Sequence, residues 1–306
     1  MSPYQQAVTV VGAGMAGAAC AAELHRAGQA VRLVERGRAP GGRMASPLVH
    51  GRRVDLGAGY FTVRDEGFRA VVEDWQRRGL ARPWTDTFAV VQVGQAPTTK
   101  AGPMRWAAAG GLRTLVRDVL GDLPVDTGQL IDVLPDGPVV LAMPDVQAAR
   151  LTAVPDAVEN RPTIAVVCAY SQRSWPFADA AFVRDHPDVT FVADDGARRG
   201  DGAPVLVAHT TPERAARHLD HPDDAIQPVL AALGELLGVG KPLWAETHRW
   251  TFAQPAGQHD ASFGLVTVDG RVIGCAGDQW CPSGSPRVES AWRSGTDLAH
   301  ALLDRV

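Results

Sequence analysis

The 306-residue sequence lacks the patterns that mark metal sites and disulfide scaffolds. It has only four cysteines, none of them in a C-x-x-C pair, and its nine histidines form no H-x-H or H-E-x-x-H motif. These are the spacings that zinc sites and redox-active dithiols need. We therefore expect no metal, and reduced cysteines of the kind found in cytoplasmic proteins.

Long apolar runs and an excess of positive charge are missing as well. No stretch of about 18 apolar residues occurs, so no membrane span is expected. Residues 8–22 are apolar and small, but no Lys or Arg precedes them and glycines stand where a signal helix should be, so we expect a cytoplasmic location. Lys and Arg number 30 against 34 Asp and Glu, and no basic cluster with aromatics appears, which argues against nucleic acid as a partner. The oligomeric state stays open.

A dinucleotide-binding fingerprint is present near the start of the chain. The stretch VTVVGAGMAGAACAAELHRAGQAVRLVE predicts a strand, a glycine turn, a helix and a second strand that ends at Glu35. The G-x-G-x-x-G spacing places Gly12 at a sharp turn, Gly14 beside a pyrophosphate and Gly17 where the helix packs on the strand. A carboxylate at Glu35 suits a ribose 2′-hydroxyl and repels a 2′-phosphate, so NADP is disfavoured.

The last part of the chain distinguishes a flavin from a nicotinamide. RVIGCAGDQW predicts a strand running into a glycine turn, followed by a helix that Ser285 and Pro286 are expected to open. Asp278, at the end of that strand, is placed to bind a polyol such as a ribityl chain. The positive N-terminus of the helix suits the pyrimidine edge of a flavin, which becomes anionic on reduction. A nicotinamide dehydrogenase needs no such strand, so we predict FAD.

The order of predicted elements indicates an α/β fold with a split nucleotide-binding domain. TIAVVCAYS, VTFVADD and PVLVAHTT are spaced like strands of an antiparallel sheet in the second half of the chain. We expect a Rossmann-type FAD-binding domain of the glutathione-reductase kind, formed by residues 1–75, 101–150 and 265–306. An inserted α+β substrate domain, built on the antiparallel sheet, is expected to comprise residues 76–100 and 151–264.

At these motifs the chain resembles the renalases and their bacterial relatives, within the amine-oxidase-like flavoproteins. The resemblance covers nearly the whole chain. GAGMAGAACAAEL, APGGRM and GCAGDQW are general to amine-oxidase-like flavoproteins, whereas GYFTVRD and HRWTFAQP are typical of the renalase-like branch. The stretch VDTGQLIDVLPDGPVVLA departs from the family, because it is too short for the family's small β-meander. The resemblance implies the following FAD-binding residues: Gly12, Gly14, Met15, Ala16, Gly17, Glu35, Arg36, Gly42, Arg43, Met44, Gly57, Ala58, Gly277, Asp278, Arg287 and Val288.

The resemblance also implies a reaction. Renalase-like enzymes oxidise misreduced dihydronicotinamide dinucleotides by hydride transfer to flavin N5, and O2 takes the electrons to give H2O2. Such a small-molecule substrate calls for an aromatic wall and a few polar contacts. The candidate catalytic residues are Tyr60, His209, His248, Trp250 and Trp280. Monoamine oxidases tether their flavin through a cysteine upstream of the final strand, but none lies between Cys168 and Cys275, so we expect non-covalent FAD.

Two other functions stay open at this point. A flavin amine oxidase or desaturase with a different small substrate fits the same FAD motifs, and only the inserted domain could separate it from a renalase-like oxidase. A flavin-binding protein without turnover fits them too, but its flavin would stay yellow when a reduced substrate is added anaerobically. On a strand, His248 and Trp250 share one face while Arg249 points away, so His248 is the better polar contact for a ring on Trp250.

Overall fold

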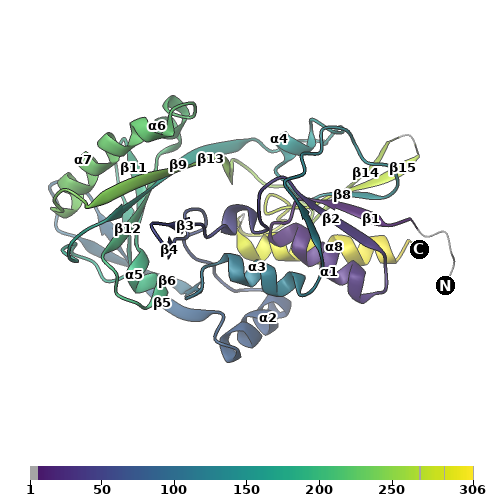
Figure 1. Ribbon diagram of the computed structural model, residues 1–306, viewed down its shortest axis with the longest axis horizontal. Coiled ribbons are helices and arrows are strands. Elements are labelled where there is room, and N and C mark those ends of the chain that lie inside the picture. The colour runs from purple at the N-terminus through teal and green to yellow at the C-terminus, as the bar shows by residue number, and fades with distance from the viewer. Residues whose placement is uncertain (1–5, 269, 286, 306) are drawn as a thin grey trace.

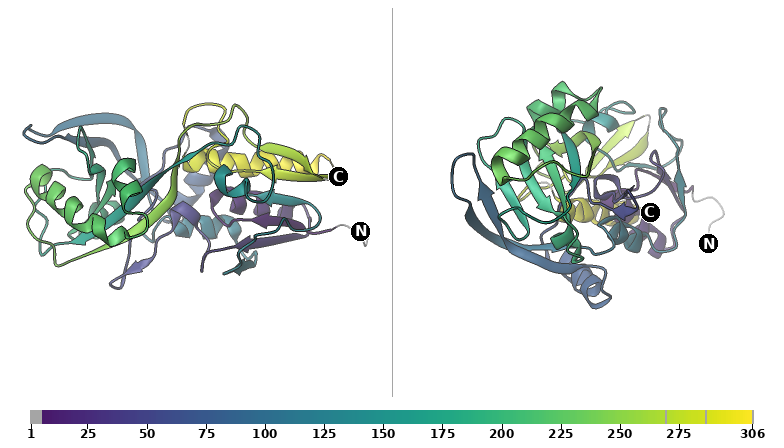
Figure 2. Two further views of the ribbon diagram at one scale, coloured as in Figure 1. Left: turned by 90° about the horizontal axis from the view of Figure 1, so that it is seen from above. Right: turned by 60° about the vertical axis from the view of Figure 1, so that its left-hand side comes forward.

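The computed structural model describes residues 6–268, 270–285 and 287–305. It consists of two lobes, each built around one large sheet (Figure 1). The first strand and the last helix of the chain both lie in one lobe, and the middle of the chain forms the other (Figure 1). Seen from above, the lobes lie end to end along the longest axis of the molecule (Figure 2). No helix in these residues is both long and apolar enough to cross a membrane.

The first lobe is a Rossmann-like layer of strands covered by helices. Every neighbouring pair of its strands is parallel except β14 and β15, which form an antiparallel hairpin at one edge. The buried apolar run of β1 explains its central position, since parallel sheets are covered on both faces. The strands, in spatial order, are β14 (Gly264–Val268), β15 (Arg271–Cys275), β8 (Val139–Leu141), β1 (Val8–Val11), β2 (Val31–Glu35) and β7 (Val125–Thr127).

Helices α1 (Met15–Arg26) and α8 (Val288–Leu303) have the most extensive helix–helix contact in this lobe. A Cβ at Gly295 of α8 would lie only 2.0 Å from the carbonyl oxygen of Ala16, so the glycine is what allows the two helices to approach. Helices α2 (Glu66–Arg77) and α3 (Arg113–Leu120) complete the core around them. Pro286, expected to open α8 with Ser285, lies outside the described residues, and the helix begins at Val288.

The second lobe is a seven-stranded sheet with helices α6 (Pro212–Arg217) and α7 (Ile226–Leu237) packed against it. The expected antiparallel sheet is present with one exception, because β5 and β10 pair in parallel. Thr211 caps α6 by accepting a hydrogen bond from the Arg214 amide, as its Thr-Pro start suggests. The strands, in spatial order, are β13 (Trp244–Pro255), β9 (Asn160–Ala169), β12 (Val205–Thr210), β11 (Val189–Asp194), β10 (Ala180–Val183), β5 (Arg82–Val91) and β6 (Thr98–Ala107).

Strand β6 shifts the expected division of the chain. The boundary expected at residues 100 and 101 falls inside this strand, and all of β6 belongs with β5 in the seven-stranded sheet. We therefore place the division after β6. The remaining elements are short: η1 (Gly42–Met44), β3 (Leu48–Val49), β4 (Arg52–Arg53), α4 (Asp145–Ala148), α5 (Asp195–Arg199) and η2 (Pro222–Ala225).

Buried charges join α5 of the second lobe to the loop at residues 55–59. Arg198 donates hydrogen bonds to the carbonyl oxygens of Asp55 and Gly59, at 3.0 and 3.1 Å. Its neighbour Arg199 lies 3.2 Å from the Asp55 carboxylate, and both arginines pair with Asp195. Burial opposes ionisation of Asp195, but the two arginines outweigh it and hold the pKa of that carboxyl below its usual range. The loop is thus held from the opposite lobe.

Candidate active site

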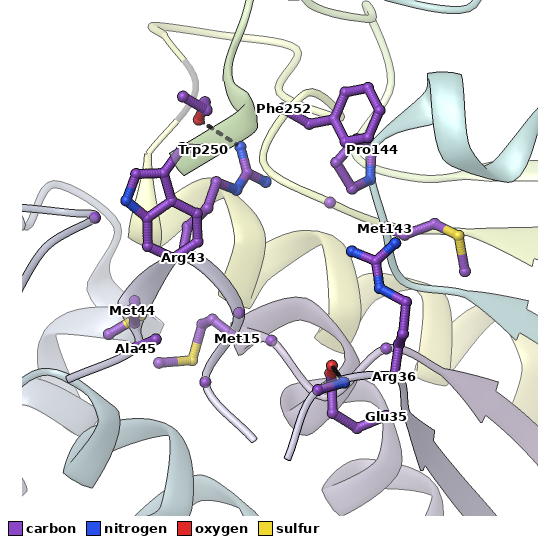
Figure 3. Close-up of a pocket in the computed structure, with 18 of the residues that line it drawn as sticks. Met15, Glu35, Arg36, Arg43, Met44, Ala45, Met143, Pro144, Trp250 and Phe252 are labelled. Carbon is purple, nitrogen blue, oxygen red and sulfur yellow. Dashed lines mark hydrogen bonds between the residues drawn. The ribbon is translucent and has the colours of Figure 1, made fainter. Parts of the chain in front are cut away.

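A single cavity of about 1440 Å³ takes its lining from both lobes. Glu35 and Arg36 lie at one side of it, and Arg43 and Trp250 lie at the other (Figure 3). Pockets for drug-sized ligands are usually about 300–1,000 Å³. This cavity is large enough for a dinucleotide and a small second ligand together.

Fifteen of the sixteen predicted cofactor residues line this cavity. The exception is Gly17, which lies beneath it at the junction of α1 with the sheet. A Cβ at Gly17 would lie 1.8 Å from the Gly12 carbonyl oxygen, so its role is to let the helix pack, as the fingerprint suggests. The residues that line the cavity are Gly12, Gly14, Met15, Ala16, Glu35, Arg36, Gly42, Arg43, Met44, Gly57, Ala58, Gly277, Asp278, Arg287 and Val288.

The start of α1 is built to receive an anion. Gly14 is its N-cap residue and has no side chain to accept from the first-turn amides. Those amides have no carbonyl within the helix, and the helix dipole adds positive potential. Gly12 has a φ of +104°, and a Cβ there would lie 2.4 Å from the Ala142 carbonyl oxygen, so only glycine fits the turn. The Gly41 amide donates to the Ala13 carbonyl and holds the second glycine turn against the first.

Glu35 is fixed by the backbone of both neighbouring turns. Its carboxylate accepts hydrogen bonds from the amides of Ala13, at 2.9 Å, and Gly37, at 2.6 Å. Each oxygen keeps a further lone pair, because a carboxylate has about four acceptor sites. The geometry therefore fits a diol such as the ribose of an adenosine.

Arg43 and Asp278 form an ion pair that separate sequence motifs could not show. The guanidinium donates two hydrogen bonds to the carboxylate, at 2.6 and 3.0 Å, in the bidentate geometry that arginine favours. It donates a third to the carbonyl oxygen of Ala253 in β13, at 3.1 Å. The pair thus connects the second glycine turn, the end of β15 and the second lobe at one point of the cavity wall.

Two side chains of the second lobe converge on one carbonyl oxygen, that of Leu56. Trp250 Nε1 donates a hydrogen bond to this oxygen at 3.0 Å, and His209 Nε2 lies within hydrogen-bond distance of it, at 3.1 Å. Because a carbonyl can only accept, the proton of His209 is on Nε2. The Trp250 ring lies over Gly57, where a Cβ would come within 3.0 Å of it.

His248 lies beside Trp250, as the strand alternation predicts. Their ring centroids are 4.4 Å apart, and both side chains line the cavity. Burial lowers the pKa of His248, so its neutral form is favoured. The side chain of Arg249 turns away and donates to the carbonyl oxygen of Leu219, at 2.6 Å. His248 is therefore the polar group next to the aromatic wall.

Tyr60 and Trp280, the other two aromatic candidates, are placed differently. Tyr60 lines the cavity and packs edge-on against Phe88, with centroids 5.2 Å apart. Trp280 does not line the cavity. It is buried and stacks on His259, with centroids 3.6 Å apart, and His259 in turn pairs with Asp145 at 2.6 Å. The expectation that Trp280 forms part of the aromatic wall is corrected, because this stacking turns its ring into the core.

The cavity also contains residues that the sequence did not single out. Phe252 continues the alternation of His248 and Trp250 along β13, so the period of two was a signal for it. Arg53 and Arg113 gave no such signal, because they come from separate short elements that only the fold brings together. Residues 129–132 of the short link between β7 and β8 also line the cavity.

His209 should make the stability of the fold depend on pH. Burial lowers its pKa from 6.5 to about 4, the nearby Arg198 adds to this, and the hydrogen bond to Leu56 opposes it. Between these pH values the unfolded chain binds a proton that the folded protein excludes. The contribution of His209 to stability is therefore complete above pH 6.5 and is lost as the pH falls toward 4, a loss of about 3 kcal/mol.

The measurement is the free energy of urea unfolding between pH 7 and pH 4.5, for the protein and for His209→Gln. Glutamine keeps an N–H donor for Leu56 but does not titrate. We expect a shallower pH dependence in the variant, and equal slopes would contradict a neutral His209.

Comparisons with known proteins agree with the fold. Residues 10–75 match the family model of the NAD(P)-binding Rossmann-like domain. The whole chain is similar in structure to putrescine oxidase bound to putrescine, with a TM-score of 0.72 and 16% identity over 99% of this chain and 100% of that one. It is likewise similar to cyclohexylamine oxidase from Brevibacterium oxydans IH-35A, with a TM-score of 0.74 and 15% identity over 99% of each chain. The chain thus combines a Rossmann-like domain with the overall fold of amine oxidases, and the expected α/β class is confirmed at that level.

Proposed function

We propose that this protein is an FAD-dependent oxidase of the renalase-like kind, which takes a hydride from a small reduced substrate and uses O2 as the electron acceptor. The observation that carries the proposal is a cavity whose two ends are lined by residues suited to the two halves of a flavin dinucleotide. At one end are Glu35 and the glycine turn at α1, and at the other are Asp278 and the start of α8. Isomers of dihydronicotinamide dinucleotides are the proposed substrates.

The residues present fit FAD. Glu35 suits the adenosine ribose, the amides at the start of α1 suit the diphosphate, and the Arg43–Asp278 pair presents polar atoms to the ribityl chain. Val288 places the positive end of the 16-residue helix α8 at the cavity, where it favours negative charge on the pyrimidine edge. No cysteine is among the described residues that line the cavity, which supports non-covalent binding.

When bound, FAD would supply two-electron chemistry: N5 would accept a hydride from the substrate, and O2 would take two electrons, the proton of that hydride and one proton from solvent to leave as H2O2. The protein's own part is to hold the substrate and keep water away. Trp250 offers a flat wall whose plane is fixed by its bond to Leu56, and neutral His248 offers one hydrogen bond beside it. Hydride transfer requires no general base, so neither histidine has to exchange a proton during the reaction.

A flavin amine oxidase is the second candidate, because both structural neighbours described above are named as amine oxidases. The same FAD contacts serve either reaction. The two candidates differ in the donor that reduces the flavin, so the substrate decides between them.

The test has two steps. The purified protein should be yellow and should release intact FAD on acid precipitation, whereas flavin retained in the pellet would show a covalent bond. The yellow protein is then mixed anaerobically with dihydronicotinamide isomers, putrescine or cyclohexylamine. Bleaching by the dihydronicotinamides alone supports the proposal, bleaching by an amine alone supports the second candidate, and no bleaching by any of these donors contradicts both assignments.

A further inference from the structure

Two arginines in the cavity wall carry charges that the described residues leave largely unbalanced. Arg113 opens α3 and Arg53 lies in β4, and both line the cavity. Within the described chain, the Arg113 guanidinium makes no hydrogen bond or ion pair, although its Nε is buried. The Arg53 guanidinium makes one hydrogen bond, to the carbonyl oxygen of Ser46 at 3.1 Å.

Ser46 contacts both residues. Its carbonyl accepts from Arg53, and its Oγ accepts from the backbone amide of Arg113 at 3.1 Å. The carboxylate that acts on Arg113 is Asp55, and it is already engaged. It accepts hydrogen bonds from Ser46 and from the Leu112 amide, and it pairs with an arginine of α5. The local charge therefore stays positive.

The electrostatics of Arg113 point the same way. Burial lowers the pKa of its guanidinium, and the charges of Arg117 and Arg53 lower it further, with Asp55 opposing them. Arginine keeps its proton at accessible pH, so burial and the neighbouring positive charges destabilise the Arg113 cation instead. An anion placed between the two guanidinium groups relieves that cost.

The position of the two arginines suits one end of an extended ligand. Ser46 is three residues from Arg43, whose carbonyl accepts from the Ala58 amide beneath the aromatic wall. Three residues span at most about 11 Å. The backbone of Ser46 is therefore within that span of Arg43, and Leu48, which pairs with Arg53 between β3 and β4 and exposes an apolar side chain, lines the same cavity.

We propose that Arg53 and Arg113 form a binding subsite for a phosphate or carboxylate group inside this cavity. Among the described residues, eight arginines and three carboxylates line the cavity, so arginines outnumber carboxylates even when the Arg43–Asp278 pair is set aside. The substrate class is therefore anionic, opposite in charge to amines such as putrescine. Assigning the anion to the substrate rests on the proposed function, since the diphosphate of FAD has the same chemistry.

The subsite is tested without turnover by calorimetric titration of the FAD-loaded protein with inorganic pyrophosphate. The variants are Arg53→Gln and Arg113→Gln, which remove the charge but keep a polar, shorter side chain. Arg217→Gln is the control, because Arg217 is exposed, is not among the cavity residues and is not one of the charges that act on Arg113. A second titration measures the affinity of each apoprotein for FAD.

We expect the affinity for pyrophosphate to fall at least about tenfold in either variant, the usual effect of losing a charge-assisted hydrogen bond. In the control this affinity should not change. Unchanged FAD affinity then assigns the subsite to the substrate. Weakened FAD affinity, with no pyrophosphate binding to the loaded protein, assigns it to the cofactor diphosphate. If neither anion is affected by either substitution, the subsite does not exist. Because the readout is binding, a failure of every donor to bleach the flavin counts against the proposed function alone.

Discussion

Replacing Trp250 by alanine is expected to slow anaerobic reduction of the bound flavin on the order of 100-fold, while the protein still folds and still binds FAD. The indole packs over Gly57 and is fixed by its hydrogen bond to Leu56, so it sets the plane in which a substrate ring lies. Without it the donor carbon is no longer held near the flavin, and displacement by about 1 Å costs about this factor. Stopped-flow absorbance of the flavin measures the rate.

Trp250→Phe is the control for this effect. It keeps a flat ring but loses the N–H that reaches Leu56, while His209 still holds that carbonyl. A much smaller loss of rate is expected. Normal reduction of the FAD-loaded alanine variant would place the substrate elsewhere, and loss of folding would make Trp250 a core residue.

The second large effect separates two glycines of one motif. A Cβ at Gly14 meets nothing closer than the Gly42 Cα, at 4.0 Å, and the backbone angles of Gly14 suit alanine. A Cβ at Gly17 meets the Gly12 carbonyl oxygen at 1.8 Å. We therefore expect Gly14→Ala to leave the apoprotein as stable as before but to weaken FAD binding by about 10- to 100-fold, the range of one or two lost hydrogen bonds to a charged group.

Gly17→Ala should instead destabilise the apoprotein itself, by about 1–3 kcal/mol or more, because the backbone must move to admit the methyl group. Urea unfolding of the apoproteins and titration with FAD give both quantities. Gly14→Ala should lower FAD affinity without lowering stability, whereas Gly17→Ala should lower the stability of the apoprotein. Equal loss of stability in both would mean that Gly14 also serves packing rather than the ligand.

Local rules account for the parts of this molecule that the sequence predicts well. The fingerprint strand, turn and helix depend on residues within a short stretch, and Gly12 and Glu35 make the contacts that such a stretch dictates. The alternation along HRWTF places His248 and Trp250 on one face for the same reason. In these cases the deciding neighbours are close in sequence.

The features that could not be predicted depend on partners far away in the chain. Arg43 and Asp278 each fitted a cofactor contact when read alone, but they are 235 residues apart and pair with each other. Trp280 stands in a flavin motif, yet stacking on His259 decides where its ring points. Strand β6 contains no composition change that would show which sheet it joins, and its pairing with β5 decides that.

The pairing of β15 with β8 also has a consequence for how the protein is made. Ile273 lies beside Val139 in the first sheet, and five of the seven strands of the second sheet, β9 to β13, are synthesised between them. On a chain that emerges from its N-terminus, the second lobe can form while the first still lacks β15 and α8. Asp278 and Val288 then arrive after every other wall of the cavity. Such long-range pairing slows folding. We therefore expect FAD to bind after the rest of the fold has formed, rather than to start folding.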